Sequence, residues 1–273
     1  MFVRHVALVS EVASIDASGL ARVSSAIQRQ VIQDLSPIWE VSATVDPFPT
    51  LEDVPAGYWP IIVTAAGLPH DLQGVHVDQH GQPMAWVEWS DSWSLTASHE
   101  CMEMLVDPWG NQLRAAHAWD GRDERVEYLL EVCDPCQDPA FSYTINDTLV
   151  SDFYTPSFFD PVAQTGKVYS KTGAIEKPLQ VLKGGYLSYR DLTTNEWSQV
   201  DGDGAVQNLG KMELGVGTGS LREGIDARTP NHLAGTKLSA DQVRARVGAR
   251  HARAKEAARL RANSIRARIS QYR

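Results

Sequence analysis

The segment Ser98-His99-Glu100-Cys101-Met102-Glu103 holds the residues of this chain that are best suited to chemistry. On a helix, side chains four positions apart lie on one face, so His99 and Glu103 point the same way and Glu100 lies beside them. An imidazole nitrogen and a carboxylate oxygen are both ligands for a divalent cation such as Zn²⁺. The spacing therefore predicts a metal site with His99 and Glu103 as ligands and Glu100 as the general base that activates water.

A solvated helix with one histidine and two carboxylates would show the same spacing, because H-E-x-x-E is less specific than H-E-x-x-H. The residues around the motif favour a buried helix instead, since they are largely apolar: Leu95, Met102, Leu105 and Val106. Ionised groups in a buried helix need partners. This requirement favours the metal site over the solvated helix.

A catalytic zinc site commonly has three protein ligands and one position open to water. Asp107 is too far from His99 to join the site, since it lies about 12 Å along the helix. Asp134 is the predicted third ligand and Glu131 the next candidate, while His76 is an alternative ligand or a supporting residue. One histidine and two carboxylates form a hard, anionic site, which would select zinc less strictly than a histidine-rich one.

The first hundred residues predict the elements that position this motif. Apolar and β-branched runs indicate strands at 3–9, 38–45, 59–64, 75–77 and 84–88, of which the last two form a hairpin. Apolar spacings of three and four indicate a helix over 17–35, ended by Ser36-Pro37, and a second helix over 93–106. The predicted fold class is α+β, with a twisted mixed sheet, an N-terminal helix and a metal-site helix.

Three parts are predicted along the chain. Residues 1–200 form the main domain, in which irregular β-hairpins follow the metal-site helix. Residues 201–238 are rich in glycine and predict a linker, and residues 239–273 predict a basic helix. The formal charge is +9 from Lys237 to the end and −18 before it. We expect the basic helix to dock on a protein or another subunit, and nucleic acid is less favoured because Tyr272 is the only aromatic residue there for base stacking.

Composition is typical of a globular protein, with 43% hydrophobic and 22% charged residues. No apolar run reaches the roughly 18 residues of a membrane span, and the apolar start is too short for a signal peptide. A cytoplasmic location without a membrane partner is therefore expected. The segment Cys133-Asp134-Pro135-Cys136 has no second cysteine pair, so it indicates a turn rather than a four-thiolate zinc site.

The stretch from Ala97 to Pro108 resembles the S-H-E-x-x-E-x-x-T/V-D/N-P segment of EXORDIUM-like and related bacterial proteins, which are regarded as zincin-like. The E-x-x-D-x-C element of that group is matched from Glu131 to Cys136, and its aromatic segment from Val150 to Pro156. The resemblance spans roughly residues 60–165. It implies a metallopeptidase core whose fourth strand is the sheet edge that pairs with an extended substrate, here Val75, His76 and Val77.

Two functions fit these observations. The first is a zinc-dependent, metallopeptidase-like hydrolase with one Zn²⁺ per chain, acting on a peptide or protein substrate. The alternative is a non-catalytic structural or interaction protein of a larger assembly, for example a virion or phage-like particle, that retains the zincin scaffold. Glu103 in place of a second histidine and the basic tail favour the alternative, whereas the buried motif favours the enzyme.

Overall fold

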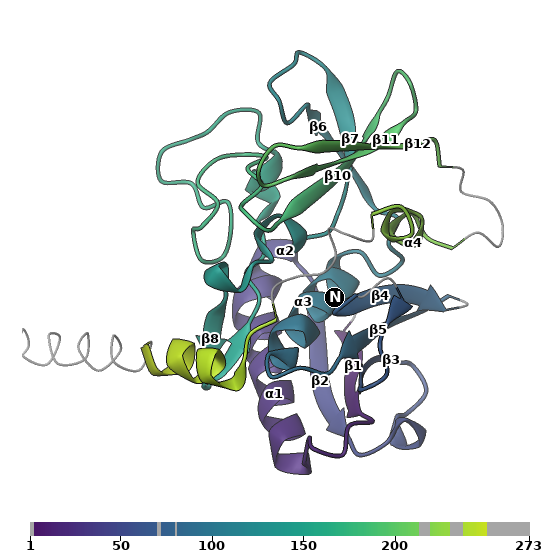
Figure 1. Cartoon of the computed structure of the whole chain (residues 1–273), viewed down its shortest axis with the longest axis vertical. Helices are drawn as coiled ribbons and strands as arrows, with labels where there is room; N and C mark the ends of the chain where they lie inside the picture. Colours follow the sequence, from purple (N-terminus) through teal and green to yellow (C-terminus); the bar gives the residue numbers. More distant parts are fainter. Residues whose placement is uncertain (1–2, 70–71, 80, 213–218, 230–236, 250–273) are drawn as a thin grey trace, which may run out of the picture.

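The structure is a computed structural model that describes residues 3–69, 72–79, 81–212, 219–229 and 237–249. Figure 1 shows two parts, a lower one built on the sheet of β1 to β5 and an upper one built on a second sheet. Helices and mixed sheets occur together, so the predicted α+β class is confirmed. One apolar core runs through both parts, and α3 lies where they meet.

The first sheet has the strand order β2-β1-β3-β5-β4. Its pairs are parallel except for β4, which runs antiparallel to β5 and forms one edge of the sheet. The predicted hairpin and the edge position of the fourth strand are therefore confirmed. The strands are β1 (Val3–Ser10), β2 (Ser42–Phe48), β3 (Tyr58–Thr64), β4 (Gly74–Gln79) and β5 (Gln82–Glu88).

The first helix runs further than the sequence predicts. α1 (Ala17–Gln30) continues through a π-helical turn, Val31–Leu35, into α2 (Ser36–Trp39). Pro37 does not stop the helix because it lies in the first turn of α2, where its missing N–H is not needed. The helix ends at Glu40, whose backbone is left-handed with φ of 55°. The second strand consequently begins at Ser42 and not at Ile38, so that predicted boundary is wrong.

The metal-site helix, α3 (Trp93–Val106), has the predicted bounds. It packs against β3, β4 and β5 on one side and against β9 on another, so every residue from Ala97 to Val106 is buried. Asp107 ends the helix, and its carboxylate accepts hydrogen bonds from the amides of Asn111 (3.1 Å) and Gln112 (2.9 Å). A polar motif on a helix without a solvent face must find its partners inside the protein.

The second sheet is antiparallel throughout and has the order β12-β11-β10-β7-β6. A short hairpin of β8 (Tyr143–Ile145) and β9 (Thr148–Val150) turns through Asn146 and Asp147, which both have positive φ. Short 3₁₀ turns, Asp134–Cys136 among them, connect β7 to β8. The strands of the second sheet are β6 (Leu113–His117), β7 (Arg125–Leu129), β10 (Tyr186–Asp191), β11 (Trp197–Asp201) and β12 (Val206–Gly210).

The segment 201–238 differs from the predicted linker, because β12 and α4 (Leu221–Asp226) lie within it. The few apolar side chains of this segment pack against apolar side chains of the second sheet, and together they form a small core. That core consists of Leu129, Trp197, Leu209, Leu221 and Ile225. Residues 201–212 and 219–229, the described part of this segment up to residue 229, therefore contribute to the fold despite their glycines.

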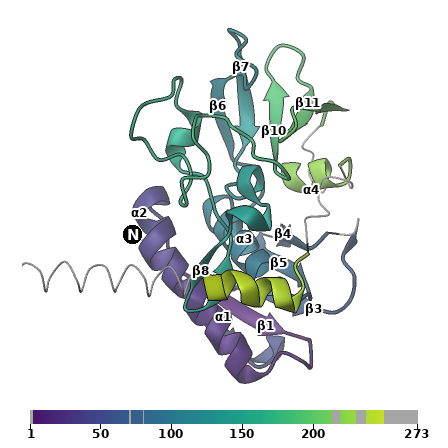
Figure 2. The ribbon, with the colours of Figure 1, turned by 60° about the vertical axis from the view of Figure 1, so that its left-hand side comes forward.

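The basic segment is helical over residues 240–249, and this part packs on the body of its own chain (Figure 2). The contacts are apolar and join Leu238, Val243 and Val247 to Leu95 and Leu149. The remainder of the predicted basic helix, 250–273, lies outside the described residues. Within the described part of the chain, no helix has both the length and the apolarity that spanning a bilayer requires.

Candidate metal centre

The three predicted ligands meet around one imidazole nitrogen. His99 Nε2 lies 3.2 Å from Glu103 Oε2 and 3.2 Å from Asp134 Oδ1. α3 supplies His99 and Glu103, while the 3₁₀ turn that follows β7 supplies Asp134. In a tetrahedral zinc site with bonds of about 2.0–2.1 Å, neighbouring ligand atoms are about 3.3 Å apart. The two distances are compatible with ligands that share one ion, and also with hydrogen bonds from a protonated His99.

His76 approaches the same cluster from β4 and is fully buried. Its Nε2 lies 3.2 Å from the carbonyl oxygen of Asp107. Because a carbonyl only accepts hydrogen bonds, Nε2 carries a proton and donates it to this oxygen. Nδ1 faces Glu100 Oε2 at 3.6 Å, Glu103 Oε2 at 3.8 Å and Glu131 Oε2 at 4.0 Å. Carboxylates that converge in this way need a cation or a proton between them.

Several polar atoms of this cluster are buried without a hydrogen-bond partner in the described part of the chain. They are His76 Nδ1, Glu100 Oε2, Glu131 Oε1 and both carboxylate oxygens of Asp134. Such atoms are costly to bury unless something binds them. The donor set of imidazole nitrogens and carboxylate oxygens fits a divalent cation. Among the described residues, three sets of buried side chains could hold a metal ion, and each includes Glu103. They are His99, Glu103 and Cys133; His76, Glu100 and Glu103; and Glu103, Glu131 and Asp134.

Arg222 is the residue that sequence reasoning missed. Its Nη1 contacts Glu131 Oε2 and lies 3.1 Å from Glu103 Oε2, while its Nε donates to Asp226 at 3.0 and 3.1 Å. Arg222 lies in the segment predicted to be a linker, so its sequence neighbours gave no sign of a buried position. The one local signal is the capping box of Ser220 and Glu223, which marks the start of α4.

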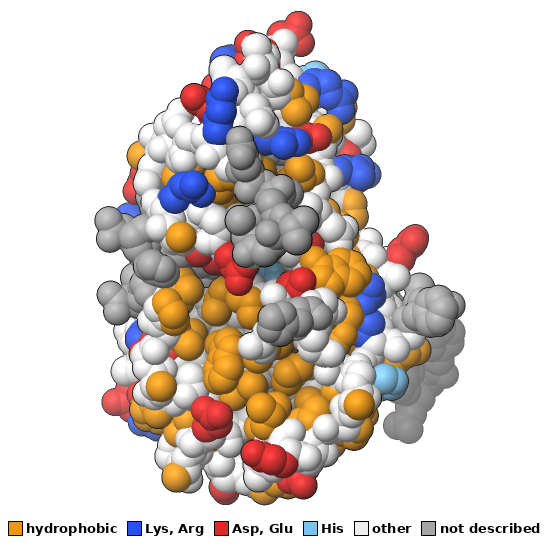
Figure 3. Space-filling model, turned by 90° about the vertical axis from the view of Figure 1, so that its right-hand side faces the viewer, with side chains coloured by type: hydrophobic (Ala, Val, Ile, Leu, Met, Phe, Trp, Pro, Cys, Tyr) orange, Lys and Arg blue, Asp and Glu red, His pale blue; other side chains and the backbone are white. Residues whose placement is uncertain are grey.

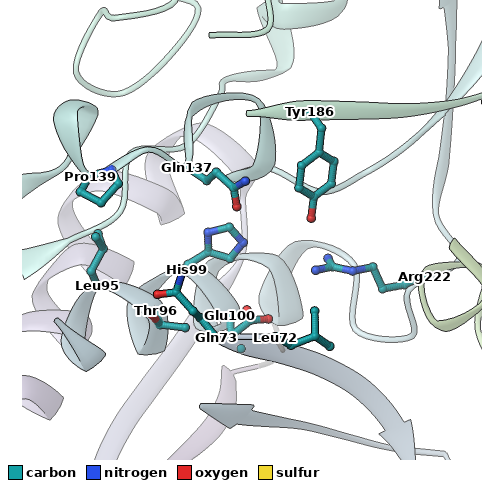
Figure 4. A pocket seen from close by; sticks show the side chains of 11 residues that line it. Leu72, Gln73, Leu95, Thr96, His99, Glu100, Gln137, Pro139, Tyr186 and Arg222 are labelled. Atoms are coloured by element: carbon teal, nitrogen blue, oxygen red, sulfur yellow. The ribbon is translucent and has the colours of Figure 1, made fainter. Parts of the chain in front are cut away.

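A pocket opens onto this cluster, between the first sheet and β10 (Figure 4). Tyr186 of β10 points its hydroxyl group into the pocket, between His99 and Arg222. Figure 3 shows a few acidic side chains near the middle of this face, with a large apolar area below them. The residues that line the pocket are Leu72, Gln73, Gly74, Leu95, Thr96, His99, Glu100, Gln137, Pro139, Tyr186 and Arg222.

Gly74 lets the edge strand approach the metal-site helix. A Cβ atom at this position would lie 2.5 Å from Glu100 Oε1 and 2.6 Å from Thr96 Cγ2, which is too close for any side chain. The Glu100 carboxylate is thus held between β4 and the pocket. Glycine is required here for the close approach of two elements, and not for a turn.

No protein-family model, curated protein or solved structure matches this chain. The similarity of the segments Ala97–Pro108 and Glu131–Cys136 to the EXORDIUM-like group therefore stays a prediction. Function has to be argued from the residues of the site and their geometry.

The charges of the cluster move the pKa values of its members apart. Burial alone would lower the pKa of His99, but the carboxylates of Glu103 and Asp134 raise it well above 6.5. Burial and the nearby charge of Glu103 raise the pKa of Asp134 to about 6, and burial likewise raises that of Glu131. Burial would also raise the pKa of Glu103, but His99 and Arg222 outweigh it and hold this pKa well below its usual value. In the metal-free protein, positive charge is therefore concentrated around Glu103.

These shifts predict an unusual pH dependence: the Tm of the metal-free protein should fall as the pH rises from about 5 to about 8. His99, Asp134 and Glu131 keep their protons to a higher pH in the folded chain than in the unfolded one. The stabilisation from these raised pKa values is complete below the unfolded values and is lost as the pH rises through the folded ones. Calorimetry in the presence of a chelator measures this trend.

Saturating Zn²⁺ provides the comparison for this pH experiment. Metal ligands must lose their protons before they bind, so the increase in Tm on adding metal should become larger with rising pH. A metal-free Tm that rises over the same pH range would contradict the assigned protonation of His99 and Asp134.

Proposed function

We propose that this protein is a metal-dependent hydrolase of the zincin type, with His99, Glu103 and Asp134 as ligands and Glu100 as general base. The observation that carries the proposal is the meeting of these three ligands at His99 Nε2, beside buried oxygen atoms that lack hydrogen bonds. Zn²⁺ is the proposed ion, although a site with two carboxylates would also accept harder cations.

Two residues of the pocket, Glu100 and Tyr186, have a direct part in the proposed reaction. A divalent cation bound at the ligands would polarise a carbonyl group and lower the pKa of a water molecule in the pocket. Glu100 lines the pocket next to His99, so its carboxylate is placed to take the proton of that water and to pass it on to the leaving amine. The hydroxyl group of Tyr186 points into the same pocket and would donate a hydrogen bond to the developing oxyanion.

The pKa of Tyr186 supports its role as a donor. Burial, and after it the charge of Asp134, raises this pKa well above 10, so the phenol keeps its proton. Three other tyrosines are candidates for this role from sequence: Tyr128, Tyr143 and Tyr154. Tyr154 is fully buried, does not line the pocket, and its hydroxyl has no hydrogen-bond partner in the described part of the chain. Tyr128 donates to the carbonyl of His117 at 2.8 Å, and Tyr143 donates to Asp34 at 2.8 Å.

A peptide is the proposed substrate because the pocket lies beside a sheet edge. β4 pairs with β5 on one side, and in the described part of the chain no strand pairs with its other side. Gln73 and Gly74, at the start of β4, line the pocket. An extended peptide that pairs with Val75, His76 and Val77 through main-chain hydrogen bonds would carry its scissile bond to Glu100.

The first test is the metal content of protein purified without a chelator. We expect about one equivalent of zinc in the wild type and its loss in His99→Ala, because a catalytic zinc site has few ligands to spare. His117→Ala is the matched control, since His117 is exposed on β6. Mass spectrometry of the metals gives the stoichiometry directly. No metal in the wild type, together with a Tm unchanged by added zinc, would contradict the proposal.

One observation favours the alternative of a non-catalytic scaffold protein. Arg222 pairs with Glu103 and Glu131 and thereby gives the carboxylates a cation from the chain itself. Absence of stoichiometric metal in the wild type would favour this alternative, because the proposed hydrolase requires the ion. A bound metal without turnover would also favour it, because zinc sites can be purely structural.

A further inference from the structure

We propose that Arg222 occupies a second cation site, so that a protein without this guanidinium group binds one more divalent cation than the wild type. The inference rests on the metal centre of the proposed function and deepens it. In this proposal the guanidinium group of Arg222 takes the place of a second ion, and the contacts of Arg222 and His76 support it.

The guanidinium group lies among three carboxylates. Arg222 Nη1 contacts Glu131 Oε2, lies 3.1 Å from Glu103 Oε2 and lies 3.9 Å from Asp134 Oδ2. The oxygen atoms of Glu103, Glu131 and Asp134 also form one of the sets that are close enough to hold a metal ion. A positive charge is therefore already bound where three buried carboxylates converge.

His76 adds an observation that the guanidinium does not explain. Its Nε2 donates to the carbonyl of Asp107, which is how metal-binding histidines are commonly oriented. Its Nδ1 is fully buried and has no hydrogen-bond partner among the described residues. This nitrogen faces the same oxygen atoms, Glu103 Oε2 at 3.8 Å and Glu131 Oε2 at 4.0 Å. A cation bound between Glu103 and Glu131 could therefore take an imidazole nitrogen of His76 as a ligand in addition to the carboxylates.

Glu103 lies between two positive positions. Its Oε2 is 3.2 Å from His99 Nε2 on one side and 3.1 Å from Arg222 Nη1 on the other. Hydrolytic centres with two metals hold their ions about 3.5–4 Å apart. In this chain the first position belongs to the proposed metal at His99 and Asp134, and the second belongs to the guanidinium group.

Arg222 is fixed in this position by the backbone around it. Its amide donates to the carbonyl of Gly110 at 3.1 Å, and the amide of Leu221 donates to Asn111 Oδ1 at 2.8 Å. Gly110 has a φ of 60°, and a Cβ atom there would lie 2.9 Å from the Cβ of Arg222. Leu221 and Ile225 anchor α4 in the second core. These contacts hold α4 at the centre, and the two hydrogen bonds from Nε to Asp226 orient the guanidinium group, which would keep a second ion out of the wild type.

The experiment is equilibrium dialysis of the full chain against Mn²⁺, a cation suited to oxygen-rich sites, with metal counted by mass spectrometry. The variants are Arg222→Ala, Arg222→Lys and the double variant Arg222→Ala/Glu131→Gln, and circular dichroism checks that each is folded. We expect Arg222→Ala to bind one equivalent more than the wild type. Arg222→Lys keeps a charge at the position and should match the wild type, and the double variant should lose the additional equivalent.

The outcomes separate this inference from the proposed function. If the wild type binds no metal and Arg222→Ala binds one equivalent, the proposed hydrolase is contradicted but the second cation site is supported. If the wild type and folded Arg222→Ala bind the same number of metal ions per chain, the inference is overturned. Should Arg222→Ala not fold in metal-free buffer, the inference expects Mn²⁺ to restore folding where NaCl of equal ionic strength does not. Failure of Mn²⁺ to restore it would overturn the inference as well.

Discussion

Replacing Glu100 with glutamine is expected to lower kcat for peptide hydrolysis by about 10²–10⁴-fold, the usual contribution of a general base. The amide cannot accept a proton from water, but it has the same size as the carboxylate and still fits against Gly74. Because Glu100 is not one of the proposed ligands, the metal content should stay at the wild-type level. Turnover of a fluorogenic peptide library and metal content, both measured on the same samples, give the result.

The control for this variant is Glu127→Gln, which makes the same chemical change outside the pocket. Glu127 lies on β7 and pairs with Arg190, and both side chains are partly exposed. We expect its turnover and metal content to match the wild type. Loss of metal together with activity in Glu100→Gln would make Glu100 a ligand, and unchanged activity would remove it from the mechanism.

The parts of the site on one helix could be predicted from sequence because their geometry is local. Three positions in Ser98–Glu103 fix the directions of His99, Glu100 and Glu103 once the segment is helical. The apolar residues around them made the helix evident, and α3 has the predicted bounds. The sequence predicts Asp134 as the third ligand, and the structure places its carboxylate 3.2 Å from His99 Nε2.

Arg222 could not be predicted because its environment is made by distant residues. Its partner Glu103 is 119 positions away in the sequence, and the segment around Arg222 is rich in glycine. Its burial depends on Leu221 and Ile225, which pack in a core with Leu129 of β7 and Trp197 of β11. Local composition indicated a linker, whereas tertiary packing decided the outcome.

The missed helix boundary has a similar cause. Pro37 is a local signal for a helix end. Ile38 and Trp39 beyond it pack against the main core, and the indole N–H of Trp39 donates to the carbonyl of Tyr154 at 3.0 Å. The π-helical turn before Pro37 accommodates the proline and lets the helix reach these contacts. The packing of Ile38 and Trp39 against the main core therefore outweighs the local tendency of Pro37 to end a helix.

Glu103→Ala is expected to lower the free energy of unfolding of the metal-free protein by about 3–5 kcal/mol, the cost of leaving buried charges without their partner. The Glu103 side chain is fully buried. Its Oε1 accepts a hydrogen bond from the amide of Cys133 at 3.1 Å, and its Oε2 faces both His99 and Arg222. Alanine removes a carboxylate whose pKa is held well below its usual value by His99 and Arg222. Urea unfolding followed by circular dichroism measures the loss.

Two further variants identify the cause of this loss. Glu103→Gln keeps the acceptor for Cys133 but removes the charge, so its loss of stability should lie between those of the wild type and the alanine variant. Glu124→Ala breaks the ion pair of Glu124 with Arg122, whose side chains are 55% and 46% exposed, and should leave stability nearly unchanged. A loss below about 1 kcal/mol in Glu103→Ala would mean that His99 and Arg222 do not depend on this carboxylate. Both the shared role of Glu103 and the second cation site would then have to be given up.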